Sequence, residues 1–137
     1  MKRGFACGVF DLFHAGHVLM LKECKAHCDY LIVALNSAIA FSGNVNPGKQ
    51  LPVYSLAERK LIMESCRYVD EVRVYNSEDE LLGLLKDLDV SVRFLGEDYR
   101  GKPITGAELG IPIHYTDRSH GLSTSVIRKR IMNGENT

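Results

Sequence analysis

The sequence has no excess of charge of either sign, because 17 lysines and arginines are balanced by 17 aspartates and glutamates. Without a net positive field the chain has no bulk attraction for nucleic acid or for an acidic lipid surface, so we expect neither as a partner. No apolar run approaches the length of a membrane span, and the first residues lack the uninterrupted apolar segment of a signal peptide. These absences favour a cytoplasmic location.

The sequence also lacks the cysteine spacing of a metal site. Cys24 and Cys28 lie four residues apart with His27 between them, and no second close pair accompanies them. In a cytoplasmic chain we interpret Cys7, Cys24, Cys28 and Cys66 as reduced thiols, and a metal-binding structural protein is the less favoured alternative.

What is present is a regular alternation of short apolar runs and helical segments within 137 residues, enough for one domain. Capping boxes, in which a serine precedes a glutamate by three residues, mark helix starts at Ser55 and Ser77. We predict strands over 3–7, 29–36, 69–75, 90–96 and 111–115, and helices over 16–28, 56–66, 79–88 and 123–133, the last ending at Gly134. The order predicts a single α/β domain, doubly wound, with a mostly parallel sheet.

Ligands of such sheets bind outside the carboxyl ends of the strands. Three segments follow predicted strands and should converge there: GVFDLFHAGH, GEDYRGK and TDRSHGLSTS. The long polar loop over 36–54 is expected to be functional or disordered, and its Lys49 is a candidate phosphate ligand or a surface lysine.

His14 and His17 lie on either side of Gly16 where the first helix should begin. Two imidazoles beside free backbone N–H groups can donate hydrogen bonds to phosphate and stabilise the charge of a five-coordinate phosphorus, and Gly16 leaves room for it. Two histidines that merely cap the helix are the alternative, and zinc is disfavoured because a third ligand is lacking. Asp11 is expected to orient a histidine, to reach Mg²⁺ indirectly or to cap a turn.

The second polar cluster precedes the last helix. Arg118 can bind phosphate in a bidentate manner, and Ser123, Thr124 and Ser125 offer hydroxyl groups at a helix start. A plain helix cap is the alternative, and the basic run over 128–130 is interpreted as a solvated helix face.

Taken together, these motifs carry a family resemblance. GVFDLFHAGH resembles the G-x-F-D-x-x-H-x-G-H signature of the nucleotidylyltransferase superfamily, and RSHGLSTSVIRKRI resembles the R-T-E-G-I-S-T-[ST] segment of small cytidylyltransferases. The segments AERKLIMESCRYVDEV and GEDYRGK are similar to the middle of that family, so the resemblance covers nearly the whole chain. It implies the Rossmann-like fold of nucleotidylyltransferases.

The resemblance also implies roles. His14 and His17 would stabilise the α-phosphate, Lys49 would hold phosphates of CTP or of the acceptor, and Arg118 with residues 123–125 would hold the β- and γ-phosphates. Further nucleotide contacts are implied for Gly8, Val9, Phe10, Asp11, Gly16, Arg67, Asp98, Ser119, Gly121 and Leu122, with Arg67 and Asp98 facing the base and ribose.

The implied reaction moves CMP from CTP, with Mg²⁺ on its phosphates, to the phosphate of a small acceptor such as glycerol 3-phosphate. The chain departs from the family at Val9, where threonine is usual, and at Ser119-His120, where Thr-Glu is usual. Its long loop also has one lysine, whereas the loop of the family is rich in lysine. An adenylyltransferase acting on heptose phosphate or FMN and a nucleotide-binding module without turnover stay open, as does a homodimer.

Overall fold

The computed structural model describes residues 1–39 and 51–134, which form a parallel sheet of five strands in the order β3-β2-β1-β4-β5. The strands and helices are β1 (Arg3–Gly8), α1 (Ala15–Ala26), β2 (Tyr30–Asn36), α2 (Leu56–Glu64), β3 (Glu71–Tyr75), α3 (Glu78–Asp87), β4 (Val92–Gly96), β5 (Ile113–Thr116) and α4 (Thr124–Asn133), with short 3₁₀ turns at Glu97–Tyr99 and Ala107–Leu109. The predicted doubly wound α/β fold is confirmed, and the sheet is parallel throughout.

The helices cover both faces of the sheet, as the apolar strands require. One core cluster joins Leu21 and Cys24 of α1 and Met63 of α2 to Val33 and Phe94 of the sheet. The other cluster joins α3, through Leu81 and Leu85, to the opposite face. Because β2 is covered on both sides, Leu31 to Leu35 are completely buried.

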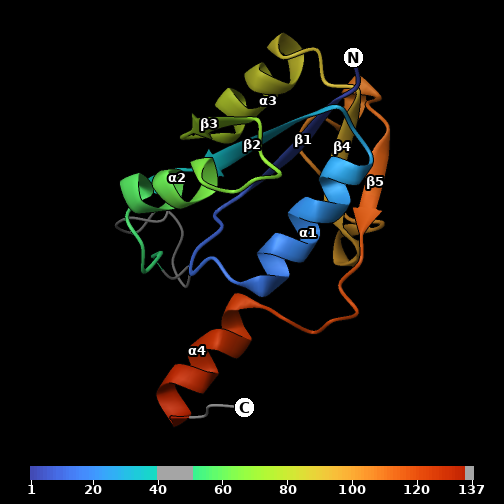
Figure 1. The fold of residues 1–137 in the computed structure, drawn as a ribbon. Coiled ribbons are helices and arrows are strands. Elements are labelled where there is room, and N and C mark those ends of the chain that lie inside the picture. Colours follow the sequence, from blue (N-terminus) through green and yellow to red (C-terminus); the bar gives the residue numbers. More distant parts are fainter. Residues whose placement is uncertain (40–50, 135–137) are drawn as a thin grey trace.

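α4 is different, because it extends beyond the carboxyl edge of the sheet and buries none of its residues fully (Figure 1). Gly134 ends it in the left-handed conformation, with φ of 66°, as predicted.

Of the two predicted capping boxes, the one at α2 forms completely and the one at α3 forms only in part. Ser55 and Glu58 exchange both hydrogen bonds, with Glu58 N donating to Ser55 Oγ and Ser55 N donating to Glu58 Oε1. At α3 only half of the box forms: Ser77 Oγ accepts from Glu80 N, but the Glu80 carboxylate accepts from Asn76 N at 2.7 Å instead of from Ser77 N.

The sheet order places the site. β1 lies between β2 and β4, so the chain connections leave β1 in opposite directions and open a crevice at its carboxyl end. The loop after β1 and the turn after β4 both meet at this crevice. All four cysteine thiols are free, and no helix of the described residues is long and apolar enough to cross a membrane.

Candidate active site

Two adjoining cavities lie at the carboxyl edge of the sheet. The larger, about 710 Å³, extends over the ends of β1 and β4, and the smaller, about 90 Å³, lies beside the start of α1. His17, Met20 and Arg118 line both cavities and form their common wall. The predicted convergence of the three loop segments therefore occurs, with residues from each of them lining the larger cavity.

The loop between β1 and α1 is bent sharply to reach this edge. Phe10 and Leu12 adopt left-handed backbone conformations, with φ of 53° and 49°, at a cost of about 1–3 kcal/mol each. Asp11 between them is buried, and its carboxylate accepts hydrogen bonds from Val53 N and Tyr54 N at 2.7 and 2.9 Å. These bonds stabilise the strained loop.

Asp11 also binds α4. Arg128 Nη2 lies 3.1 Å from its Oδ2, and the hydroxyl of Thr124 donates to its backbone carbonyl at 3.2 Å. Arg128 was predicted to belong to a solvated helix face; this is wrong, because its guanidinium pairs with the buried Asp11 carboxylate. The donors around Asp11 show an anchoring role, which the sequence alone left open.

The two histidines start α1. His14 is the N-cap residue, and its Nδ1 accepts a hydrogen bond from Gly16 N at 3.0 Å, while His17 Nδ1 accepts from His14 N at 3.1 Å. In a neutral imidazole one nitrogen accepts and the other carries the proton. Both rings are therefore held with Nε2–H as the free donor, and their centroids lie 4.0 Å apart.

The environment keeps both imidazoles neutral near pH 7. Burial, His14 and Arg118 lower the pKa of His17 to about 4, with a smaller opposing effect from Asp11. Burial, His120 and Arg118 lower the pKa of His14. An anion brought between these groups would reverse the charge effects, so the site is electrostatically suited to a phosphate.

Gly16 is required by its protein neighbours. A Cβ at this position would lie 2.8 Å from His14 Cε1 and 3.0 Å from Leu122 Cβ. A side chain here would push the capping imidazole out of place, which is a reason for glycine in addition to the predicted one, room for a phosphate.

The segment before α4 brings a second group of residues to the smaller cavity. Arg118, His120, Leu122 and Thr124 line it, and His120 was not among the predicted site residues. The remaining predicted residues have structural contacts: Ser119 donates to Asp117, Gly121 turns the chain with φ of 70°, Ser123 caps α4 and Ser125 is exposed.

Arg59 of α2 is another residue that sequence reasoning missed. It is buried, and its guanidinium donates hydrogen bonds to the backbone carbonyls of Val9, Asn36, Ser37 and Tyr54. It thereby holds together the chain segments that leave β1 and β2. The signal was present in AERK, where an arginine follows the helix cap by four residues, but the pattern alone does not place it.

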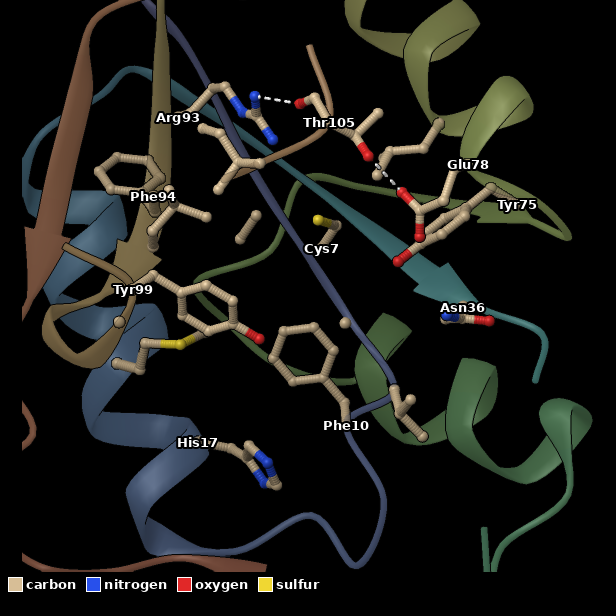
Figure 2. A pocket seen from close by; sticks show the side chains of 18 of the residues that line it. Cys7, Phe10, His17, Asn36, Tyr75, Glu78, Arg93, Phe94, Tyr99 and Thr105 are labelled. Carbon is tan, nitrogen blue, oxygen red and sulfur yellow. Dashed lines mark hydrogen bonds between the residues drawn. The ribbon is translucent and has the colours of Figure 1, made fainter. Parts of the chain in front are cut away.

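The inner end of the larger cavity is polar. Arg93 of β4 is buried and donates from Nη1 to the carbonyl of Thr105 at 2.6 Å, while the Thr105 hydroxyl donates to Glu78 Oε2 at 2.6 Å. None of the ion pairs among the described residues includes Arg93. Figure 2 shows these three residues at one end of the cavity and His17 at the other, with Phe10 and Tyr99 between them.

The remaining predicted residues differ in their placement. Gly8, Val9 and Phe10 line the larger cavity; Asp98 does not, but its Oδ1 lies 3.7 Å from Nη1 of Arg118, which does. Arg67 does not join the site: it is exposed in the turn that leads from α2 into β3, at the amino edge of the sheet, because α2 runs back from the carboxyl edge before β3 begins. Lys49 lies outside the described residues.

Comparison with known proteins shows the family of this chain. Residues 5–130 match the family model described as cytidylyltransferase-like. Glycerol-3-phosphate cytidylyltransferase of Bacillus subtilis is 34% identical over 132 residues, covering 96% of this chain and 98% of that protein. The bifunctional protein HldE of Campylobacter concisus is 33% identical over the same length, but the chain spans only 27% of HldE.

Solved structures show the same fold. The lipopolysaccharide core biosynthesis protein of Thermoplasma volcanium superposes with a TM-score of 0.63 at 24% identity, covering 84% of this chain and 93% of that one. Pantoate-beta-alanine ligase of Francisella tularensis gives a TM-score of 0.60 at 18% identity, covering 93% and 67%. With residues 5–130 matched by the family model and the site assembled at the β1–β4 crevice, the chain belongs to the cytidylyltransferase-like family of nucleotidyltransferases.

Proposed function

We propose that this protein transfers CMP from CTP to the phosphate of a small hydroxyl-bearing acceptor and releases pyrophosphate. The observation that carries the proposal is the pair His14 and His17, held by backbone hydrogen bonds with both Nε2–H groups free at a cavity wall shared with Arg118. This arrangement suits the α-phosphate, because its donors are positioned before the substrate arrives.

Each residue has a defined task in the reaction. An oxygen of the acceptor phosphate attacks the α-phosphorus in line, the bond to the bridging oxygen breaks, and pyrophosphate leaves with the bonding electron pair. His14 and His17 donate hydrogen bonds to the α-phosphate oxygens as charge builds on them, and Arg118 faces the departing phosphates. No covalent enzyme intermediate is needed, so positioning and charge stabilisation account for catalysis.

Mg²⁺ would enter as part of the nucleotide substrate. Among residues 1–39 and 51–134 no group of three histidine, cysteine or acidic side chains could hold a metal ion. Mg²⁺ usually keeps several waters and binds through substrate phosphates with one or two carboxylates, so a dedicated protein cage is not required. When bound it would neutralise part of the phosphate charge.

The inner end of the larger cavity supports an acceptor that carries hydroxyl groups. Arg93 can donate and Glu78 can accept hydrogen bonds there, and Thr105 joins the two. Glycerol 3-phosphate has this chemistry, and the similarity to the Bacillus subtilis enzyme favours it. An adenylyltransferase acting on a sugar phosphate is the second candidate, because relatives named HldE match at similar identity.

A nucleotide-by-acceptor matrix with a pyrophosphate readout tests the proposal. CTP and ATP are each combined with glycerol 3-phosphate, a heptose phosphate and FMN, in the presence of Mg²⁺. We expect the highest kcat/KM for CTP with glycerol 3-phosphate. Preferred turnover of ATP would assign the protein to the adenylyl group, and nucleotide binding without pyrophosphate release in any combination would make it a binding module.

A further inference from the structure

Three histidines at this site share one hydrogen-bonding arrangement. His120 Nδ1 accepts from Leu122 N at 2.9 Å, as His14 Nδ1 accepts from Gly16 N and His17 Nδ1 from His14 N. Because an accepting Nδ1 carries no proton, the proton of each ring is on Nε2. Backbone contacts thus fix the donor atom of all three imidazoles, which come from two segments more than 100 residues apart in the chain.

Two of these donors have no protein partner. His14 Nε2 and His120 Nε2 are the only fully buried side-chain nitrogen or oxygen atoms without a hydrogen bond among the described residues. Both rings line the smaller cavity. Buried polar groups are nearly always hydrogen-bonded, so two unpartnered donors on residues that line one cavity favour an acceptor bound there.

The size and lining of the cavity define that acceptor. Its volume of about 90 Å³ equals that of about three water molecules at ~30 Å³ each, close to a phosphoryl group. Arg118 adds a guanidinium to the lining, and no carboxylate takes part, while the hydroxyl proton of Thr124 is already donated to the Asp11 carbonyl. The lining therefore suits an oxyanion and has no group that would repel it.

We propose that His120 is an additional phosphate-binding residue of this cavity, where the family resemblance already implies the β- and γ-phosphates, and that it donates through Nε2–H. The inference rests on the proposed nucleotidyl transfer: His17, Met20 and Arg118 form the wall shared with the larger cavity, so a phosphate chain can extend from one cavity into the other. The smaller cavity holds a terminal phosphate of the nucleotide, and the pyrophosphate after the bond to the α-phosphorus has broken.

The histidine at position 120 distinguishes this chain from the cytidylyltransferase segment that it resembles. The cytidylyltransferase segment that RSHGLSTS resembles has glutamate at the position of His120. A glutamate carboxylate accepts hydrogen bonds and carries negative charge, whereas imidazole Nε2–H donates. We therefore expect tighter retention of pyrophosphate here than a glutamate at this position would allow.

Two substitutions separate the donor from the structural contact. His120→Asn keeps an oxygen that can accept from Leu122 N, as asparagine does in turns, but removes the Nε2 donor. His120→Gln places an amide N–H near the position of Nε2 and gives up the Nδ1 contact. His27→Asn is the control, because His27 is an exposed histidine at the other end of α1.

Calorimetric titration of the full chain with sodium pyrophosphate, with and without Mg²⁺, needs no turnover. We expect His120→Asn to weaken pyrophosphate binding by about tenfold or more, as for a lost hydrogen bond to a charged group, and His120→Gln to retain most of the affinity. In turnover, pyrophosphate inhibition should weaken in the same order, while His27→Asn behaves as the wild type.

The proposal is overturned if His120→Asn binds pyrophosphate as tightly as the wild type, or if both variants lose affinity equally together with a lowered Tm, which would assign His120 to ordering residues 120–122. The proposed function fails separately. Pyrophosphate binding with the expected variant pattern, but no turnover of any nucleotide, would keep the phosphate-binding role of His120 and remove the nucleotidyl transfer.

Discussion

His14 and His17 hold each other at the start of α1: the backbone N–H of His14 donates to His17 Nδ1 at 3.1 Å, and the two rings lie 4.0 Å apart. The pair thus forms a capping box from two imidazoles, a role usually taken by serine or threonine with glutamate. The bonds that start the helix also direct both Nε2–H groups, so local structure and the proposed chemistry depend on the same atoms.

The histidine pair can be tested without removing the cap. His14→Asn retains an oxygen that can accept from Gly16 N, and His17→Asn retains one for His14 N, but both lose Nε2–H. We expect kcat to fall by about 10²–10³ in each variant, with a smaller change in CTP affinity, because the lost donors act on the transition state. Single-turnover rates and calorimetric CTP binding measure the two effects.

Alanine at either position should add a loss of stability. Without any cap acceptor the first turn of α1 loses about 1 kcal/mol. If an asparagine variant with a wild-type Tm also kept wild-type turnover, the two imidazoles would be helix caps alone.

Stability should depend on pH through His17. Its pKa in the folded protein is about 4, below the ordinary 6.5, so the unfolded chain takes up a proton between these values that the native state does not. The free energy of unfolding should therefore keep the full contribution of His17 above about pH 6.5 and lose it as the pH falls toward 4. Urea unfolding at steps from pH 7.5 to 4 measures this.

The His17→Asn variant is the control for that titration. It should show a shallower decrease over the same interval, because its side chain does not titrate, while His14, whose pKa is also lowered, remains. Parallel curves for the variant and the wild type would show that His17 is not the group responsible.

Asp11 should matter for stability more than a loop aspartate normally does. Asp11→Ala removes the acceptor of Val53 N and Tyr54 N and leaves Arg128 without its partner. We expect a loss on the order of 3 kcal/mol, at the low end of the range for breaking a buried ion pair by deleting one side, because the Arg128 side chain is 34% exposed and water can solvate it when its partner is gone. Urea unfolding measures it.

A double-mutant cycle with Arg128→Met separates the ion pair from the backbone contacts. Arg128→Met alone should cost less than Asp11→Ala, and the coupling between them should be favourable. Equal stability of Asp11→Ala and the wild type would remove the anchoring role assigned to Asp11.

The acceptor end of the larger cavity depends on Arg93 and Glu78. Arg93→Met should raise the KM for the acceptor by about 10-fold to 100-fold, as expected for a lost hydrogen bond from a charged group, and leave the KM for CTP nearly unchanged. Glu78→Gln should act in the same direction but less strongly. Steady-state kinetics with each substrate varied in turn measures both.

Arg73→Met is the matched control, since Arg73 is an exposed arginine of β3 that pairs with Glu71 away from the cavity. A rise in the KM for CTP, with the acceptor KM unaltered, would mean that the inner end of the cavity holds the nucleotide.

The fold followed from local patterns, because each element depended on residues close to it in the chain. β2 is a run of apolar residues buried on both faces, α2 begins at a reciprocal capping box, and α4 ends at a left-handed glycine. The alternation of such elements allows few arrangements other than a parallel sheet with helices on both faces. The positions of His14, His17 and Arg118 near one another followed from the rule that loops after parallel strands meet at one edge.

The positions of several side chains depend on the tertiary structure, because the spacing of residues in the sequence does not predict them. Arg67 lies at the far edge of the sheet although its neighbours in sequence are part of the family pattern, because α2 carries the chain back before β3. Arg128 reaches Asp11 across 117 residues, and His120 meets His14 across a cavity that exists only when both loops are folded. A sequence determines local conformation through contacts within a few residues, whereas a buried donor, an ion pair or a cavity depends on segments that only the completed sheet brings together.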